Sequence, residues 1–427
     1  MKIYNCPSQG ELDELLRRPV RDASELGATV AAVLADVRQR GDAAVRDYEE
    51  KFDHVRLSDL AVSDDEMRAA EALVSDELKQ AIKVAHQNIH RFHEAQRFDG
   101  KHIQVTNGVE CWQKSVAIER VGLYIPGGTA PLFSTVLMLA TPAKIAGCKE
   151  IVLCTPPARD GSVNPAILIA ARTAGVSRIY KIGGVQAIGA MAYGTQSVPK
   201  VYKIFGPGNQ FVMCAKQQVS LHDVAIDMPA GPSEVEVLAD ETSNVSFVAA
   251  DLLSQAEHGP DSQVLLVCKS LETARKVEEE VEQQLARLPR KDIAAQALSH
   301  SKAIIVRDDN EMMDITNRYA PEHLIIETSN YMELSEKVVN AGSVFLGPLT
   351  PESAGDYASG TNHTLPTGGY AVAYSGVNLD SFCRKVTFQH IQPEGIKAIG
   401  RAVELMAEAE GLDAHKNAMT LRMKSEE

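Results

Sequence analysis

One polar segment, DLLSQAEHGP at residues 251–260, carries an amide and an imidazole close together in the sequence. Asn244 can cap a helix that runs from there to His258, and the Gly-Pro pair that follows can end it. Gln255 and His258 are three residues apart, so they share one helix face and could supply an oxygen and a nitrogen to a metal ion. A polar helix end, with His258 favoured by the helix dipole, explains the same residues without a metal.

A second segment, APEHL at residues 320–324, comes just before an apolar stretch that is typical of a strand. Its adjacent Glu322 and His323 combine a carboxylate with an imidazole, which suits general acid–base catalysis. Neighbouring side chains of an extended segment point to opposite faces, so both can reach one substrate only if the backbone turns there. An exposed glutamate beside a capping histidine is the alternative interpretation.

The long polar stretch of residues 347–368 contains two further candidates, Asp356 and His363, which could bind a metal or a substrate. A loop of this length without secondary structure of its own is usually functional. In the C-terminal tail, Glu410 and His415 place another acid and imidazole near the end of a helical run. A histidine in such a tail is more often an exposed surface group, so His415 carries little weight by itself.

Three glycine-rich turns are associated with predicted strands: LYIPGG (123–128), GGVQ (183–186) and FGPGN (205–209). Glycines after a strand let the backbone approach a phosphate or ribose closely, and the N-terminus of a following helix favours an anion. None of the three is the full G-x-G-x-x-G fingerprint, so the spacing alone is weak support for dinucleotide binding. Tyr124 in the first turn could stack on a ring.

The elements that must position these residues alternate between short apolar strands and helices over most of the chain. Apolar spacings of three and four predict helices at 23–52 and 64–98, and a hairpin is predicted at 101–125. Two βα series and a helical tail follow. The predicted strands are 151–154, 179–182, 201–205 and 235–239 in the first series, and 264–268, 303–306, 324–326 and 343–346 in the second.

We therefore expect an α/β fold with two incomplete Rossmann-like βα domains, each built on a mainly parallel sheet. An N-terminal helical segment and hairpin (1–120) is expected to pack with the second βα block. The first βα domain is expected at 121–240 and the second at 241–380, followed by a helical tail at 381–427. The glycine-rich turns fall in the first βα domain, and most metal and acid–base candidates fall in the second.

The composition narrows the class of protein. The 427 residues carry a formal net charge of −14, which argues against nonspecific nucleic-acid binding. No apolar run reaches the ~20 residues of a membrane-spanning helix, and the N-terminus lacks the apolar core of a signal peptide, so we expect a cytoplasmic protein. The seven cysteines are scattered without zinc-binding spacing, so any metal site must use His, Asp, Glu and Gln. The polar and glycine-rich segments described above indicate a metal-using α/β enzyme with general-base carboxylate and histidine groups, and they do not separate a hydrolase from a dehydrogenase.

The chain resembles the histidinol dehydrogenase family from end to end. Nine segments occur in the family's order, of which GPSEV, DLLSQAEH, PEHL and GDYASGTNHTLPT are the most specific. The others are LYIPGG, GGVQAIGA, FGPGN, NAGSVFLG and EGLDAHKNAM. The resemblance implies an oxidoreductase that uses NAD and one zinc ion per subunit. It would convert L-histidinol through L-histidinal to L-histidine, the final step of histidine biosynthesis.

The same resemblance implies roles for individual residues. Zinc would be held by Gln255, His258, Asp356 and His415. Glu322 and His323 would be the catalytic acid–base pair. Contacts to the substrate would come from these six residues and from Ser233, His363 and Glu410, and contacts to NAD from Tyr124, Gln186 and Asn209. The family is a homodimer with intertwined tails, so the tail with His415 would complete the site of the partner subunit.

Two other functions stay open. A zinc hydrolase on a similar scaffold would use Glu322 to polarise a metal-bound water, and a divergent homologue could bind a metal or an imidazole without catalysis. The presence of Glu322, His323 and all four implied ligands argues against the non-catalytic homologue. In the dehydrogenase, His323 suits proton shuttling because its reference pKa is about 6.5, and Glu322 suits activation of the water that attacks the aldehyde. A cysteine thiohemiacetal is the rival for that step, but no cysteine lies in the polar motifs.

Overall fold

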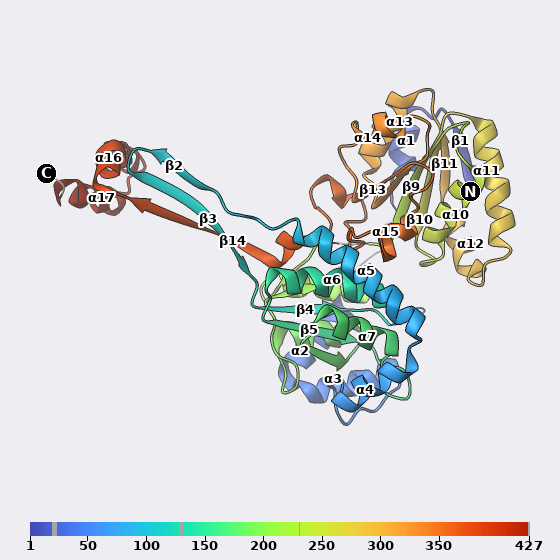
Figure 1. Cartoon of the computed structure of the whole chain (residues 1–427), viewed down its shortest axis with the longest axis horizontal. Coiled ribbons are helices and arrows are strands. Elements are labelled where there is room, and N and C mark those ends of the chain that lie inside the picture. The colour runs from blue at the N-terminus through green and yellow to red at the C-terminus, as the bar shows by residue number, and fades with distance from the viewer. Residues whose placement is uncertain (19–23, 128–130, 230, 426–427) are drawn as a thin grey trace.

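The computed structural model describes residues 1–18, 24–127, 131–229 and 231–425. Gly128 of the LYIPGG motif lies outside the described residues. Figure 1 shows two βα units and a narrow arm that projects away from them. The expected α/β fold with mainly parallel sheets is confirmed.

The first unit is built on a five-stranded parallel sheet. Its strands are β4 (Arg120–Tyr124), β5 (Glu150–Thr155), β6 (Arg178–Lys181), β7 (Lys203–Phe205) and β8 (Ala225–Ile226). They alternate with α6 (Phe133–Ala146), α7 (Pro165–Ala174), α8 (Gly184–Tyr193) and α9 (Gln210–Ser220). Side chains of β5 alternate between two cores: Ile151 and Leu153 lie in one, and Val152 and Cys154 in the other. The strand order is β6-β5-β4-β7-β8, so it reverses between β4 and β7.

The second unit is built on a six-stranded parallel sheet. Its strands are β1 (Lys2–Asn5), β9 (Glu234–Ala239), β10 (Gln263–Cys268), β11 (Lys302–Ile305), β12 (His323–Ile326) and β13 (Ser343–Leu346). Its helices are α1 (Gln9–Leu15), α10 (Val245–Ala256), α11 (Leu271–Leu285), α12 (Lys291–Ser299), α13 (Asp309–Tyr319), α14 (Tyr331–Ser335) and α15 (Glu352–Tyr357). The strand order is β1-β11-β10-β9-β12-β13, which repeats the order of the first unit apart from β1 at the edge.

From residue 24 onward the N-terminal helices pack mainly on the first unit, which corrects the expectation that the N-terminal segment packs with the second block. Strand β1 and helix α1 do belong to the second unit. The helices from residue 24 onward are α2 (Ser24–Arg40), α3 (Asp42–Tyr48), a π-helix η1 (Glu49–Asp53), α4 (Asp64–Leu73) and α5 (Asp76–Glu94). Helix α2 contacts α8 and α9, α4 contacts α7, and α5 contacts α6. Apolar periodicity identifies which face of a helix is buried, but it does not identify the sheet that buries it.

The arm is a three-stranded antiparallel sheet with two helices at its free end (Figure 1). It consists of β2 (His102–Thr106), β3 (Val109–Ala117), β14 (Cys383–Ile391), α16 (Pro393–Ala409) and α17 (Asp413–Ser425). The expectation of a wholly helical tail is therefore wrong for residues 383–391. This segment is a strand because it pairs with β3 along its whole length, with Phe388 stacked on Trp112 at 5.3 Å.

Two further expectations need correction. Strand β9, assigned to the first βα series, lies in the middle of the second sheet, because hydrogen bonding to β10 and β12 places it there. The stretch expected as a loop without secondary structure, residues 347–368, contains α15 and is followed by two 3-10 turns, η2 (Tyr370–Val372) and η3 (Leu379–Phe382). Among the described helices, none is both long enough and apolar enough to cross a membrane.

Candidate active site

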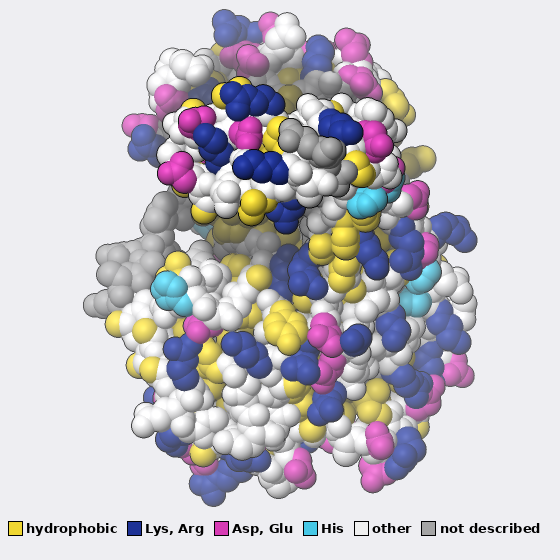
Figure 2. Space-filling model, turned by 90° about the vertical axis from the view of Figure 1, so that its left-hand side faces the viewer, with side chains coloured by type: hydrophobic (Ala, Val, Ile, Leu, Met, Phe, Trp, Pro, Cys, Tyr) yellow, Lys and Arg dark blue, Asp and Glu magenta, His cyan; other side chains and the backbone are white. Residues whose placement is uncertain are grey.

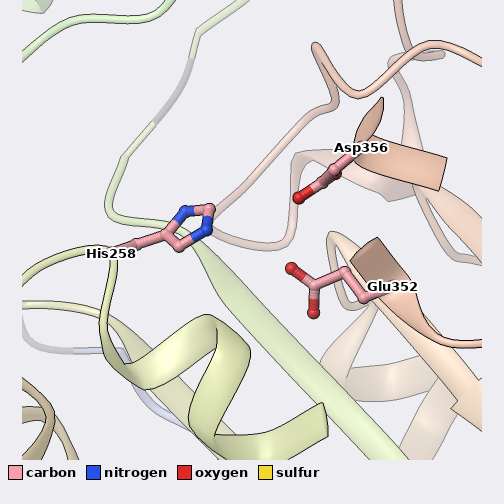
Figure 3. A group of neighbouring side chains, drawn as sticks. All are labelled: His258, Glu352 and Asp356. Carbon is pink, nitrogen blue, oxygen red and sulfur yellow. The ribbon is translucent and has the colours of Figure 1, made fainter. Parts of the chain in front are cut away.

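Three side chains of the second unit converge on one space (Figure 3). A ring nitrogen of His258 and carboxylate oxygens of Glu352 and Asp356 all lie within 4.8 Å of one another. His258 follows the last turn of α10, whereas Glu352 and Asp356 project from α15, one helical turn apart. Imidazole and carboxylate groups at this separation can close around one divalent cation.

Gln255 lies in the last turn of α10, and its side chain is completely buried. Neither the oxygen nor the nitrogen of its amide has a hydrogen-bond partner among the described residues. The same holds for both carboxylate oxygens of the buried Glu352. Buried polar groups nearly always have partners, so these four atoms indicate a group that binds here and satisfies them.

Glu352 is a site residue that the sequence analysis missed. Burial raises the pKa of its carboxyl well above the usual range, and repulsion from Asp356, Glu322 and Asp251 raises it further. A site in which carboxyl groups repel one another in this way favours a bound cation. The signal in the sequence was the four-residue spacing of Glu352 and Asp356, which fits one helix face, in a stretch interpreted as a loop.

Glu322 and His323 lie together at the amino end of β12, and both are buried. Ala320 adopts a left-handed backbone conformation with a φ of 49°, so the chain does turn just before the pair. Oε2 of Glu322 and Nδ1 of His323 are 3.7 Å apart, and Nε2 of His323 lies 3.8 Å from Oδ1 of Asp356. The turn thus brings both side chains beside the ligand cluster.

Burial and two hydrogen bonds with the backbone of Glu234 determine the protonation of this pair. Nδ1 of His323 lies 3.2 Å from the carbonyl oxygen of Glu234, which can only accept, so Nδ1 carries the proton. Nε2 is therefore unprotonated, and it has no hydrogen-bond partner in the described part of the chain. Burial lowers the pKa of His323 to about 4, which favours the neutral ring. Burial raises the pKa of Glu322 well above its usual range, while the backbone N–H of Glu234 donates to its Oε2 at 2.9 Å.

His363 links the cluster to the first unit. Its Nδ1 donates to the carbonyl oxygen of Asp356 at 2.9 Å, so its Nε2 accepts from the hydroxyl of Thr135 at 3.1 Å. Thr135 is in the first turn of α6, which follows β4 and therefore begins at the carboxyl edge of the first sheet. Ser233, which is partly exposed, directly precedes Glu234 and so lies beside the pair.

Tyr124, Gln186 and Asn209 all lie at the carboxyl edge of the first sheet. Tyr124 ends β4, and its hydroxyl accepts from the backbone N–H of Gly184 at 3.1 Å. Gln186 is completely buried and donates from Nε2 to Glu49 at 2.8 Å. The side chain of Asn209 caps the N-terminus of α9. Doubly wound sheets bind nucleotides at the carboxyl edge where their strand order reverses, and this edge fits that rule.

Glu410 and His415 are not brought to the cluster within one chain. Glu410 caps the C-terminus of α16 and His415 lies in α17, two helices at the free end of the arm (Figure 1), and both residues are exposed. Of the four residues implied as metal ligands, the fold gathers His258 and Asp356, with Gln255 on the adjacent helix turn. It leaves His415 on the arm.

The chain has two βα units, each built on a parallel sheet, and carboxylates and imidazoles are gathered where the units meet. This arrangement defines the class of the protein, an α/β enzyme. Its sequence matches the family described as histidinol dehydrogenase over residues 16–423. It is 65% identical to a histidinol dehydrogenase of Bacteroides thetaiotaomicron over 423 residues, which cover 99% of each chain. It is 54% identical to a histidinol dehydrogenase of Escherichia coli K12, with 98% of this chain and 96% of the relative covered.

A solved structure agrees with these relatives. The crystal structure of histidinol dehydrogenase from Elizabethkingia anophelis superimposes with a TM-score of 0.98 at 54% identity and covers 100% of this chain and 98% of that one. The chain therefore belongs to the histidinol dehydrogenase family, whose members are oxidoreductases.

Proposed function

We propose that this chain oxidises L-histidinol through L-histidinal to L-histidine, using zinc and NAD, as the last step of histidine biosynthesis in the cytoplasm. The observation that carries the proposal is the unprotonated Nε2 of His323, which has no hydrogen-bond partner among the described residues and faces Asp356 of the ligand cluster at 3.8 Å. A general base beside a metal site is the arrangement that oxidation of a bound alcohol requires. Family membership supplies the substrate.

The residues of the cluster fit a zinc ion. Gln255, His258 and Asp356 would hold it from one chain, and His415 from a second chain. The amide of Gln255, which has no hydrogen-bond partner within the part of the chain that the structure describes, supports this assignment, since such an amide oxygen is free to bind a metal. The bound ion would orient the imidazole and amine of the substrate. The neighbouring carboxyl of Glu352 would balance the positive charge.

His323 would act on the alcohol. Its Nδ1–H is held by the carbonyl oxygen of Glu234, so the ring cannot rotate freely and Nε2 stays directed at the cluster. At Nε2 it would take the proton of the substrate hydroxyl in the first oxidation. The aldehyde stage needs a water molecule, and the buried carboxyl of Glu322 would take a proton from it.

A cysteine adduct is the less favoured route for the aldehyde stage. Burial raises the pKa of the thiols of Cys148, Cys154 and Cys268, which is the opposite of what a cysteine nucleophile requires.

Tyr124, Gln186 and Asn209 would contact NAD, which accepts a pair of electrons in each oxidation. The bond between His363 and Thr135 supports this placement, because it ties the proposed substrate site to the helix that begins at the cofactor edge. Both ring nitrogens of His363 are already bonded, so its contact with substrate would replace the bond to Thr135.

The protein would work as a homodimer with shared sites. Figure 2 looks along the arm from its free end and shows hydrophobic side chains among the charged ones. Exposed hydrophobic residues on the arm include Ile103, Val105, Leu405, Met406 and Leu421. Apolar surface of this kind is typical of an interface, and a second chain would cover it while receiving Glu410 and His415.

An absorbance assay separates the proposal from its alternatives. Purified protein incubated with L-histidinol and NAD should produce reduced nicotinamide, and a zinc chelator should abolish the signal. A zinc hydrolase would cleave ester or amide substrates and produce no reduced nicotinamide, whereas a binding homologue would retain zinc and show neither activity. No signal from protein that contains zinc would contradict the proposal.

A further inference from the structure

The proposed acid–base pair is held by one neighbouring residue, Glu234 at the start of β9. Its backbone N–H donates to Oε2 of Glu322 at 2.9 Å, and its carbonyl oxygen accepts from Nδ1 of His323 at 3.2 Å. The position of Glu234 therefore sets both the direction of the carboxyl and the tautomer of the imidazole.

The side chain of Glu234 is itself held by a distant part of the chain. Its side chain is almost fully buried, and it accepts from Nε of Arg18 at 2.6 Å and from Nη2 of Arg18 at 2.7 Å. The backbone N–H of Gly368 also donates to it at 3.1 Å. A two-pronged contact between a guanidinium and a carboxylate fixes orientation as well as distance.

Arg18 also contacts the segment of the chain that leads into Glu322 and His323. Its Nη2 donates to the carbonyl oxygen of Tyr319 at 2.6 Å, and its guanidinium lies 4.1 Å from the centre of the Tyr319 ring. Tyr319 is the last residue of α13 and is followed by Ala320, whose φ of 49° begins the turn into Glu322 and His323. A residue other than glycine in this backbone conformation is strained and persists only where its surroundings hold it.

We propose that Arg18 is a positioning residue for the acid–base pair. It fixes the segments at Glu234 and at Tyr319, and these two segments orient the side chains of Glu322 and His323. The proposal rests on the proposed roles of that pair. It requires no contact between Arg18 and the substrate, the metal or the cofactor. Its effect on the rate comes from geometry, since a displacement of about 1 Å at a reacting group can cost about 10²-fold in rate.

The chain provides a matched control in the first unit. Arg120 makes the same kinds of contact: its Nε donates to Glu150 at 2.5 Å, and its Nη1 donates to the carbonyl oxygen of Lys200 at 2.9 Å. It lies at the start of β4, at the edge of the sheet opposite to the proposed cofactor residues. Arg120→Met therefore removes a comparable ion pair and backbone contact, and it leaves the surroundings of Glu322 and His323 unchanged.

The experiment compares Arg18→Met and Arg120→Met for kcat, KM, zinc content and melting temperature. Arg18→Met should lower kcat about 10²-fold while KM for histidinol and zinc content stay near those of the parent. Arg120→Met should keep the parent kcat. An unchanged kcat in folded Arg18→Met, an equal loss in both variants, or loss of zinc from Arg18→Met would overturn the proposal.

Arg18→Lys covers the case in which Arg18→Met does not fold. Lysine keeps the positive charge but lacks the planar guanidinium that donates two parallel hydrogen bonds. The kcat of Arg18→Lys should therefore lie below the parent value but above the value expected for the loss of Arg18, which is about 10²-fold lower. Full kcat in Arg18→Lys would contradict a role that depends on the bidentate geometry.

A double-mutant cycle shows whether Arg18 acts through the pair. His323→Ala should lose about 10²–10⁴-fold in rate, and adding Arg18→Met should cost less than about tenfold more, because the group being positioned is gone. Losses that multiply in full would show that Arg18 acts elsewhere. A normal rate in His323→Ala would reject the acid–base assignment itself, whereas a disabled His323→Ala with a normal Arg18→Met rejects only the positioning role.

Discussion

A mixture of two inactive variants, His258→Ala and His415→Ala, should regain activity. His258 lies in the second unit beside Asp356 and Glu352, while His415 lies on α17 at the free end of the arm. The arm is not a loose tail, because β14 pairs with β3 from Cys383 to Ile391. If each site combines the second unit of one chain with the arm of another, each variant alone has two defective sites per dimer.

The size of the recovery follows from counting sites. In a mixed dimer, one site carries both substitutions and the other carries neither. Random pairing of equal amounts makes about half of all dimers mixed, so about a quarter of all sites should be intact. The mixture should therefore show about a quarter of the parent activity and of its bound zinc.

The assay requires dimers that contain one chain of each variant. The two variants are co-expressed with different affinity tags, the mixed dimer is isolated by two successive purifications, and its histidinol oxidation is measured. The isolated mixed dimer should show about half of the parent activity, because one of its two sites is intact. Each variant purified alone is the control. If His415 acts within its own chain, every site keeps one defect, so an inactive and verified mixed dimer would refute the shared site.

Three further predictions concern variants with a single substitution. His258→Ala should lose zinc while its melting temperature stays within a few degrees of the parent, because His258 is exposed; full zinc content would exclude it as a ligand. Glu322→Gln should slow oxidation of supplied histidinal more than oxidation of histidinol, and an unchanged histidinal rate would remove its role in water activation. Burial raises the pKa of Glu236 to about 8 against about 4.5 unfolded, so the unfolded chain releases this proton first and the parent should lose stability as pH rises between these values. Glu236→Gln should therefore gain about 1–4 kcal/mol relative to the parent between pH 5 and pH 8 in denaturant titrations, and no change with pH would contradict this.

Local sequence patterns predicted the strands well because each is a short apolar run bounded by turns. The predicted strands at 151–154, 179–182, 264–268 and 303–306 all correspond to strands in the structure. What could not be predicted was the partner of each element. Strand β9 joins the second sheet, α5 packs on α6, and residues 383–391 become a strand, because contacts between segments far apart in sequence decide these outcomes.

The candidate site could be predicted to a similar extent. Motifs singled out Glu322 and His323 as candidates, and the turn at Ala320 is the structural feature that places both side chains beside the ligand cluster. Glu352 was missed because a six-residue helix within a polar stretch has too few residues to show a period. Arg18 lies 216 residues from Glu234 in the sequence, and no local pattern links them.

The most direct test of the proposed two-step oxidation is the ratio of reduced nicotinamide to histidine formed from a limiting amount of L-histidinol. Absorbance gives the first quantity, and chromatographic analysis of the same reaction gives the second. Because each of the two oxidations delivers one electron pair to NAD, we expect two reduced nicotinamides for every histidine, with no free histidinal left at completion. One reduced nicotinamide per histidinol, with histidinal as the final product, would contradict it.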